Sequence, residues 1–309
     1  MTVVRVPVGG GTPEGTNSAY LVDERVLVDP GPPTESAWSN LQNGLEAELE
    51  ALADLEYVVC THWHADHVGL APRLAEAADA TVAMGERDAP LLADYAAERE
   101  ARLERDAAAM VAWGVPEDVV TAVVEGDRPS PLPDATPVES LVDGQTVAGL
   151  EVLETPGHTA GHVSLATDET LVLGDAALPT YTPNVGGSDT RTRGTDPLGT
   201  YLETLDRLLA REGVESGAVT LRPGHGETVD PERIEALRGH HDERTRRVKT
   251  ALESRTEATP WDLARDLFGE LEGIHAKFGA GEVAAHLERL ERDGVVECEE
   301  GGRYGIANE

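Results

Sequence analysis

The sequence gathers three histidines and an aspartate within six residues. His62, His64, Asp66 and His67 directly follow an apolar run at 57–60, which we expect to be a strand. Imidazole nitrogens and carboxylate oxygens suit zinc and neighbouring transition metals as ligands. In a tight turn the first two histidines can point one way while Asp66 and His67 point another. The spacing therefore predicts a metal-binding loop at a strand end, and such a loop can serve two adjacent ions.

Three further residues of ligand type follow later apolar runs that we also expect to be strands. His158 and His225 each come directly after a Pro-Gly pair, and Asp175 comes after a glycine. Loops at strand ends often carry function, and a sheet can build a site at its rim when each strand end contributes one side chain. We therefore group these three residues with the cluster at 62–67 as candidate metal ligands.

The order of these residues resembles the metallo-β-lactamase-fold hydrolase superfamily between residues 26 and 226. The resemblance implies an α/β fold, an αββα sandwich with a dinuclear metal site between its two sheets. It also implies that Asp29, in an Asp-Pro-Gly turn, supports the metal loop without binding metal. It implies that one ion is held by His62, His64 and His158, that a second is held by Asp66, His67 and His225, and that Asp175 bridges both.

The implied cofactor is a pair of divalent metal ions, with zinc as the expected metal and manganese or iron as alternatives. Two adjacent cations lower the pKa of a shared water and so provide hydroxide near neutral pH. This metal-bridging hydroxide would attack a carbonyl or a phosphorus centre. Asp66 is the candidate catalytic residue, because its carboxylate can orient the water or shuttle a proton. The Gly-x-Ser-x-Gly pattern of a serine nucleophile is absent from the sequence, which favours a metal-activated nucleophile.

The charge of the chain narrows the choice of partners. Of 309 residues, 58 are Asp or Glu and 25 are Lys or Arg, which gives a formal net charge of −33. Such a surface repels phosphate backbones and anionic lipids, so it disfavours nucleic-acid binding by the whole protein and docking on a membrane. Lys249 and Lys277 are the only lysines, and acidic excess with so little lysine resembles the proteins of halophiles.

Other features of the sequence bear on the compartment. No apolar run reaches membrane-spanning length, and the first residues lack the basic start and apolar stretch of a signal peptide. Two cysteines, Cys60 and Cys298, are too few for a disulfide framework. We therefore expect a cytoplasmic protein.

Hydrophobic patterning predicts two domains. Residues 1–235 alternate strand and helix candidates, which favours layered α/β structure, with a helical insertion at about 89–126. From about residue 230 onward, three helix candidates precede two short strands around Gly301-Gly302, a pattern typical of a winged helix. We therefore predict a metallo-hydrolase domain at 1–235 and a winged-helix-like domain at 236–309.

Two resemblances point to different substrates. A metallo-hydrolase domain with a C-terminal winged helix resembles the β-lactamase-like protein 2 group, whose animal members point to single-stranded RNA. The string Thr-Pro-Gly-His-Thr-Ala-Gly-His at 155–162 resembles hydroxyacylglutathione hydrolases (glyoxalase II), which cleave thioesters. Because the chain is acidic, we predict a small-molecule ester or thioester as substrate. The alternative is a single-strand-specific endoribonuclease.

An alternative of another class is a non-catalytic DNA-binding regulator, which the complete ligand set disfavours. The winged helix would then have a different task, such as capping the site or forming a homodimer interface. Some side chains keep two interpretations. His162 either orients a ligand or is structural. Arg191 and Arg193 either meet an anionic group of the substrate or are solvated. His241 lies on a polar helix, and we expect it to be solvated.

Overall fold

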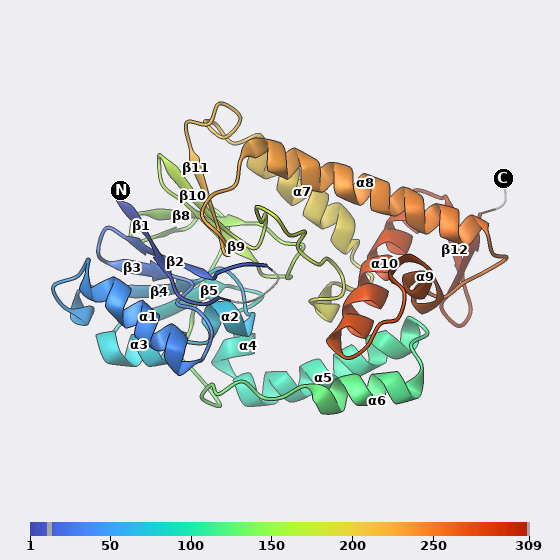
Figure 1. The fold of residues 1–309 in the computed structure, drawn as a ribbon, viewed down its shortest axis with the longest axis horizontal. Helices are drawn as coiled ribbons and strands as arrows, with labels where there is room; N and C mark the ends of the chain where they lie inside the picture. The colour runs from blue at the N-terminus through green and yellow to red at the C-terminus, as the bar shows by residue number, and fades with distance from the viewer. Residues whose placement is uncertain (11–13, 308–309) are drawn as a thin grey trace. The chain divides into compact units, whose positions relative to one another are not determined.

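Short runs rich in valine form the first sheet of a sandwich in the computed structural model, which describes residues 1–10 and 14–307 (Figure 1). Strands β1, β2 and β3 pair antiparallel, and β3 to β6 pair parallel, in sequence order. Parallel pairing brings the carboxyl ends of β3, β4 and β5 to one edge of the sheet. The strands are β1 (Val3–Pro7), β2 (Ser18–Val22), β3 (Val26–Val28), β4 (Tyr57–Cys60), β5 (Thr81–Gly85) and β6 (Glu139–Leu141).

The second sheet of the sandwich has the strand order β11-β10-β9-β8-β7. Its neighbours pair antiparallel except for β10 and β11, which pair parallel. The carboxyl ends of β10 and β11 therefore lie at the same edge, and the residues that follow these two strands come close together. The strands are β7 (Thr146–Val147), β8 (Leu150–Glu154), β9 (Val163–Ala166), β10 (Thr170–Gly174) and β11 (Thr220–Pro223).

The strands of the first sheet are apolar on both faces, because one face meets the second sheet and the other meets helices. Val28 and Val59 belong to a buried cluster with Val152 of the second sheet. Leu27 and Val58 precede them by one position, point the opposite way and pack in a cluster with residues of α1 and α3 (Figure 1). Helix α1 spans Glu35–Glu46, and helix α3 spans Ala71–Ala78.

The last turns of helix α7 (Pro197–Leu209) lie against the second sheet. The hydroxyl of Thr204 donates to the main-chain oxygen of Pro156 at 2.7 Å. The guanidinium of Arg207 donates to the main-chain oxygen of Glu154, the last residue of β8, at 3.0 Å. Helices therefore lie on both sides of two packed sheets, and the predicted αββα sandwich is confirmed.

The chain groups into two compact units. The first comprises Met1–Arg99, Pro129–Pro183 and Thr204–Glu235, and it contains the sandwich; the second comprises Glu100–Arg128, Asn184–Glu203 and Ala236–Glu309. One boundary between the units falls after residue 235, and the assignment of two domains stays a prediction. The contiguous range 1–235 nevertheless differs from the first unit, because two internal segments group with the C-terminal residues.

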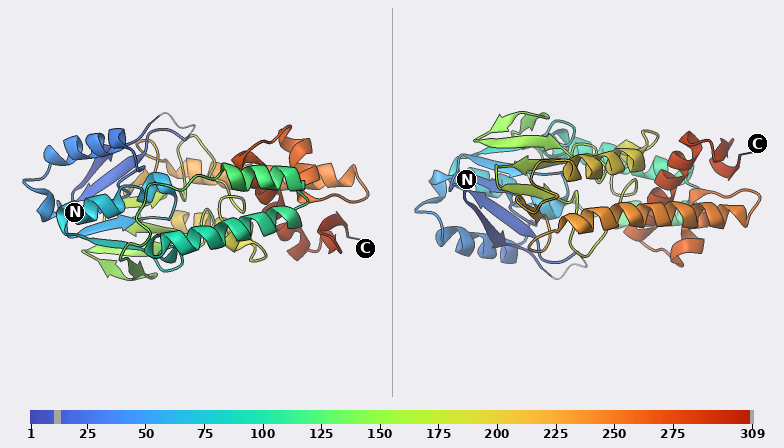
Figure 2. Two further views of the ribbon diagram at one scale, coloured as in Figure 1. Left: turned by 90° about the horizontal axis from the view of Figure 1, so that it is seen from below. Right: turned by 90° about the horizontal axis from the view of Figure 1, so that it is seen from above.

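Helices dominate the second unit. Helices α5 (Tyr95–Ala112) and α6 (Glu117–Gly126) run alongside each other (Figure 2). They lie in the predicted helical segment at 89–126, and Gly114, with a positive φ of 81°, lies between them. Trp113 and its neighbours on these helices share a buried cluster with Trp261 and Ala280. This packing holds residues 100–128 in the same unit as the C-terminal residues.

From Pro231 to residue 307 the chain forms three helices and then a two-stranded antiparallel sheet. Helix α9 begins with a capping box, in which the side chains of Thr259 and Asp262 each accept from the main-chain N–H of the other. This order of elements is the expected one, and the winged-helix assignment stays a prediction. The elements are α8 (Pro231–Glu253), α9 (Pro260–Phe268), α10 (Ile274–Arg292), β12 (Val296–Glu299) and β13 (Arg303–Ile306).

Short helices fill several connections of the chain. The short helix α2 follows β4 and carries part of the 62–67 cluster. Over residues 1–10 and 14–307, no helix is both long and apolar enough to cross a membrane. The remaining short elements are η1 (Leu52–Asp54), α2 (Ala65–Val68), α4 (Pro90–Ala93) and η2 (Thr190–Thr192).

Candidate metal centre

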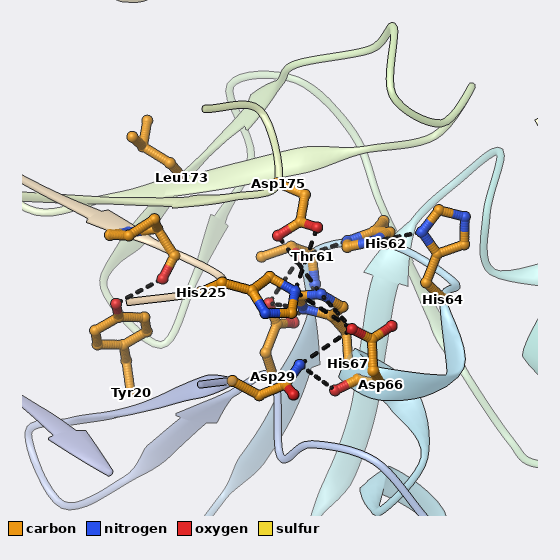
Figure 3. A network of polar contacts seen from close by, with 12 residues as sticks. Tyr20, Asp29, Thr61, His62, His64, Asp66, His67, Leu173, Asp175 and His225 are labelled. Atoms are coloured by element: carbon orange, nitrogen blue, oxygen red, sulfur yellow. Dashed lines mark hydrogen bonds and ion pairs between the residues drawn. The ribbon is translucent and has the colours of Figure 1, made fainter. Parts of the chain in front are cut away.

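The loop after β4 presents the 62–67 cluster in two directions. His62 and His64 precede helix α2, and His64 is its N-cap, with extended backbone. Asp66 and His67 lie within that four-residue helix. The change from extended to helical backbone separates the two pairs, as the spacing predicts (Figure 3).

A first group of imidazoles converges beside this loop. Nε2 of His62 and Nε2 of His158 each lie 3.0 Å from Nδ1 of His64. Ligand atoms that surround a tetrahedral zinc at 2.0–2.1 Å are about 3.4 Å apart, so three nitrogens this close can share one ion. The ligand atoms of these three histidines all lie within 4.8 Å of one another.

A second group combines two imidazoles with a carboxylate. Oδ2 of Asp66 lies 3.3 Å from Nε2 of His225 and 3.6 Å from Nε2 of His67. His67 is 1% exposed, and its Nε2 has no hydrogen-bond partner among the described residues. A buried nitrogen without such a partner is costly, and a cation beside its lone pair would remove that cost.

Asp175 lies between the two groups (Figure 3). Its Oδ1 is 3.5 Å from Nε2 of His67, and its Oδ2 is 3.6 Å from Nε2 of His225 and 3.9 Å from Nε2 of His158. Within the described chain, Oδ1 of Asp175 has no hydrogen-bond donor. One carboxylate therefore faces both groups, so the donor set and its unpaired atoms fit two cations. The structure brings all seven predicted residues together, and their roles as ligands stay predictions.

Burial keeps the imidazoles of His62 and His64 neutral. It lowers the pKa of His64 to about 3, and burial with the nearby imidazoles lowers the pKa of His62 well below its usual value. A neutral imidazole offers a lone pair, which is the form that binds a metal.

The second group is electrostatically different. Burial opposes charge on His67 and His225, but Asp175 and Asp66 outweigh it; the pKa of His67 is raised well above its usual value and that of His225 to about 9. Burial would raise the pKa of both carboxyls, yet His67 and His225 more than offset it and lower them. The carboxylates thus favour positive charge beside them, which protons or a divalent cation can provide.

Asp29 orients one imidazole of each group. Its carboxylate accepts from the main-chain N–H and the hydroxyl of Thr61, at 2.7 and 2.8 Å, and from Nδ1 of His67 at 3.0 Å. Because the Thr61 hydroxyl donates to Asp29, its oxygen accepts from Nδ1 of His62, 3.0 Å away. Both imidazoles are therefore oriented through Nδ1, with Nε2 facing the centre. These contacts match the support role that the family resemblance implies for Asp29.

His162 belongs to this supporting layer. Its Nε2 accepts from the main-chain N–H of Asp175 at 3.0 Å, so its Nδ1 donates to the hydroxyl of Thr155 at 2.8 Å. Of its two sequence interpretations, the structure favours the one in which it orients a candidate ligand. Two other supporting residues, Asn17 and Asp88, have no recognisable sequence signal, because they contact the centre across 25 or more positions.

The structure places Arg191 and His241, two candidate residues outside the 62–67 cluster, in specific contacts. Arg191 is engaged by Asp189, whose carboxylate accepts from its Nε and Nη2 at 2.6–3.1 Å, so its charge is already matched. The expectation that His241 is solvated is wrong: it is 1% exposed and stacks edge-on against Tyr201 with ring centroids 5.3 Å apart. The polar helix pattern around it gave no sign that this face packs against other helices.

Comparisons with known proteins agree with the geometry. Residues 12–214 match the metallo-beta-lactamase superfamily. The chain is 26% identical to a beta-lactamase-like protein 2 homolog of Caenorhabditis elegans, covering 94% of this chain and 83% of that protein. It is 28% identical to the probable metallo-hydrolase YqjP of Bacillus subtilis, covering 95% and 92%.

Two further likenesses concern function and fold. The chain is 27% identical to an atrochrysone carboxyl ACP thioesterase of Aspergillus fumigatus, covering 94% of this chain and 82% of that protein. The crystal structure of the metallo-beta-lactamase family protein TTHA1429 from Thermus thermophilus is similar with a TM-score of 0.77 and 31% identity, covering 98% of each chain. The family match over about two thirds of the sequence, the shared fold and the cluster at the strand ends show that this chain belongs to the metallo-β-lactamase superfamily and is a hydrolase.

Proposed function

We propose that the chain is a dinuclear metal-dependent hydrolase that cleaves a small-molecule ester or thioester. The observation that carries this proposal is the position of Asp175, whose two oxygens lie 3.5–3.9 Å from imidazole nitrogens of both groups. A single buried carboxylate in that position fits a bridge between two ions. His62, His64 and His158 would hold one ion, and Asp66, His67 and His225 would hold the other.

Bound divalent ions would supply Lewis acidity and lower the pKa of water at the site. The two carboxylates of the centre, Asp66 and Asp175, would have different roles. The Asp66 side chain is 38% exposed and that of Asp175 is 8% exposed, so Asp66 is the carboxylate that can reach water and substrate. Asp66 would orient the attacking water and accept or return a proton at Oδ1 or Oδ2. Asp175 would stay fixed between the groups.

Zinc is the proposed metal, with manganese or iron as alternatives. Five of the seven candidate ligands are imidazoles, which suit zinc, iron and copper, and the two carboxylates extend the range to manganese. Metal analysis of protein expressed without added metal would separate these cases.

Two observations support an ester or thioester over RNA. One of the relatives is a thioesterase of Aspergillus fumigatus, and it matches 94% of this chain. The chain also carries a net charge of −33, which opposes the approach of a polyanion. A small substrate needs contacts with the centre and few charges elsewhere.

We further propose a cytoplasmic location, because the two cysteines are free, one buried and one exposed, as a reducing compartment allows. The acidic surface fits a salt-rich cytoplasm. The C-terminal helices and β12–β13 hairpin remain a proposed winged helix, acting as a cap or in a homodimer.

The test is hydrolysis by metal-loaded protein in molar KCl. Acyl thioesters, matched oxygen esters and a single-stranded RNA are compared in wild type, in Asp66→Asn and in Asp168→Asn, a control at an exposed hairpin turn. We expect thioester or ester turnover that Asp66→Asn lowers by at least 100-fold and Asp168→Asn leaves unchanged. RNA cleavage that depends on Asp66, with every ester untouched, would support the endoribonuclease instead.

A further inference from the structure

Asp88 connects two loops of the candidate centre without belonging to either. It is fully buried in the turn between β5 and α4. Its Oδ2 accepts from the hydroxyl of Thr159 at 2.7 Å and from the main-chain N–H of Trp63 at 3.3 Å. Its Oδ1 accepts from the main-chain N–H of Gly161 at 2.8 Å.

These donors flank the candidate ligands of the first ion. Trp63 stands between His62 and His64, and Thr159 follows His158. The three imidazoles come from two loops that lie about 95 positions apart in the sequence, and Nε2 of His158 lies 3.0 Å from Nδ1 of His64. A carboxylate that bonds to both loops therefore fixes the spacing of the three nitrogens.

The backbone is shaped around the same contact. A Cβ on Gly161 would lie 2.3 Å from the main-chain nitrogen of Asp88 and 2.6 Å from its Oδ1. A Cβ on Gly85, at the end of β5, would lie 2.1 Å from the oxygen of Gly161. Glycines at both positions let the Asp88 turn and the 158–162 loop approach closely enough for these hydrogen bonds.

We propose that Asp88 is a positioning residue for the ion held by His62, His64 and His158, an inference that rests on the proposed dinuclear function. Its task complements that of Asp29, which contacts the imidazole of His67 directly. Loss of Asp88 should loosen the first ion and spare the ion held by Asp66, His67 and His225.

The experiment measures stepwise metal affinity of the full-length protein by chelator competition, with no substrate present. Asp88→Asn replaces one acceptor oxygen by an amide that faces a donor. Thr159→Val removes a single hydrogen bond to Asp88 and keeps the side-chain shape. Thr245→Val is the control in the second unit, because it removes the hydrogen bonds of a threonine hydroxyl to the main-chain oxygen of His241 and to Nδ1 of His286, away from the centre.

We expect Asp88→Asn to weaken one ion by about 10- to 100-fold and Thr159→Val to weaken the same ion by less. Thr245→Val should change neither. To identify the ion, each substitution is combined with His158→Ala or His225→Ala. With His225→Ala, Asp88→Asn should weaken the remaining tight site by the same factor, whereas with His158→Ala it should leave the remaining affinity unchanged.

Equal weakening of both ions, or lower thermal stability with both affinities intact, would show a merely structural role and overturn the inference. If Asp88→Asn does not fold, the same two outcomes are read from Thr159→Val. Wild-type protein that binds fewer than two ions would instead contradict the proposed dinuclear function.

Discussion

The side-chain amide of Asn17 donates to both the main-chain oxygen and Oδ2 of Asp66, each at 3.1 Å. Asn17 is 3% exposed, and its backbone forms a bridge with His225. One residue thus links the candidate catalytic carboxylate to another candidate ligand of the second group. The same Oδ2 faces His67 and His225, so Asn17 helps to determine which oxygen of Asp66 points at the centre.

Asn17→Ala should therefore lower kcat more than it lowers metal content. A hydrogen bond to a charged group contributes about 1.5–3 kcal/mol, which corresponds to a loss of about 10- to 100-fold in rate if it acts fully in the transition state. Asn40→Ala, which removes an amide from an exposed helix position, is the control. Unchanged turnover of the ester in Asn17→Ala would show that Asp66 does not need this orientation.

Removing a candidate ligand should remove metal and activity together. His62→Ala and Asp175→Ala each delete a side chain that faces the centre, and Asp175 faces both groups. We expect metal content to fall from two ions to one or none, with hydrolysis reduced by at least 1,000-fold, on the order of several kcal/mol of lost stabilisation. Elemental analysis checks the prediction, with the exposed His275→Ala as control. Full occupancy in both variants would reject the ligand assignment.

Sequence reasoning found the centre because its chemistry is local. His62, His64 and Asp66 lie within one turn of chain, and each later ligand follows a short apolar run. The supporting residues could not be found in this way. Asn17 and Asp88 are single polar residues in turns, and their hydrogen bonds to the centre span 49 and 25 or more positions.

In the second unit, too, sequence patterns do not show which distant segments pack together. Residues 100–128 join the C-terminal residues through two contacts of Trp113. Its side chain packs in a cluster with that of Trp261, and its main-chain oxygen accepts from the main-chain N–H of Trp261 at 2.9 Å. Helix periodicity shows which face of α5 or α6 is apolar, but it does not show which distant segment covers that face. A contiguous domain was therefore the expectation from sequence.

Acid should destabilise the second unit through two buried imidazoles. Burial lowers the pKa of His241 to about 3, with His240 and Arg244 adding to the effect, and burial with His241 lowers that of His286 well below its usual value. Both rings stay neutral in the folded protein while the unfolded chain takes up protons below pH 6.5. Stability is therefore complete above about pH 6.5 and falls toward pH 3, by up to about 1.4 kcal/mol per pH unit for each ring.

Urea unfolding at several pH values checks this prediction. His241→Phe keeps an aromatic ring beside Tyr201 and removes one titrating group, so the pH dependence should become shallower between pH 6 and 4. The exposed His275→Ala should leave the slope unchanged. Equal slopes in wild type and His241→Phe would contradict a neutral buried imidazole.

Salt should stabilise the fold. The net charge of −33 repels itself in dilute buffer, and at 1 M salt the Debye length falls to about 3 Å, which screens that repulsion. We expect the Tm to rise by at least about 10 °C between 0.1 and 2 M KCl. A thermal scan of metal-loaded protein measures it, and a flat or falling Tm would contradict adaptation to high salt.

A buried ion pair joins three segments of the second unit. Asp106, on α5, is 4% exposed and accepts from Nζ of Lys277 at 2.9 Å, from Arg102 at 3.2 Å and from the hydroxyl of Thr190 at 2.6 Å. Lys277 lies on α10 and is 2% exposed. The ammonium of Lys277 is therefore paired with the carboxylate of Asp106 in the interior of the unit.

Lys277→Met should cost about 3–5 kcal/mol of unfolding free energy, because it leaves a buried carboxylate with less compensation. Lys249→Met, at an exposed pair with Glu253, should cost less than about 1 kcal/mol and serves as the control for the only other lysine. Combining Lys277→Met with Asp106→Leu should recover much of the loss, because the buried carboxylate that has lost its lysine is then removed as well. Additive losses in the double variant, measured by urea unfolding at high salt, would show that Asp106 and Lys277 act independently and that packing alone joins residues 100–128 to α10.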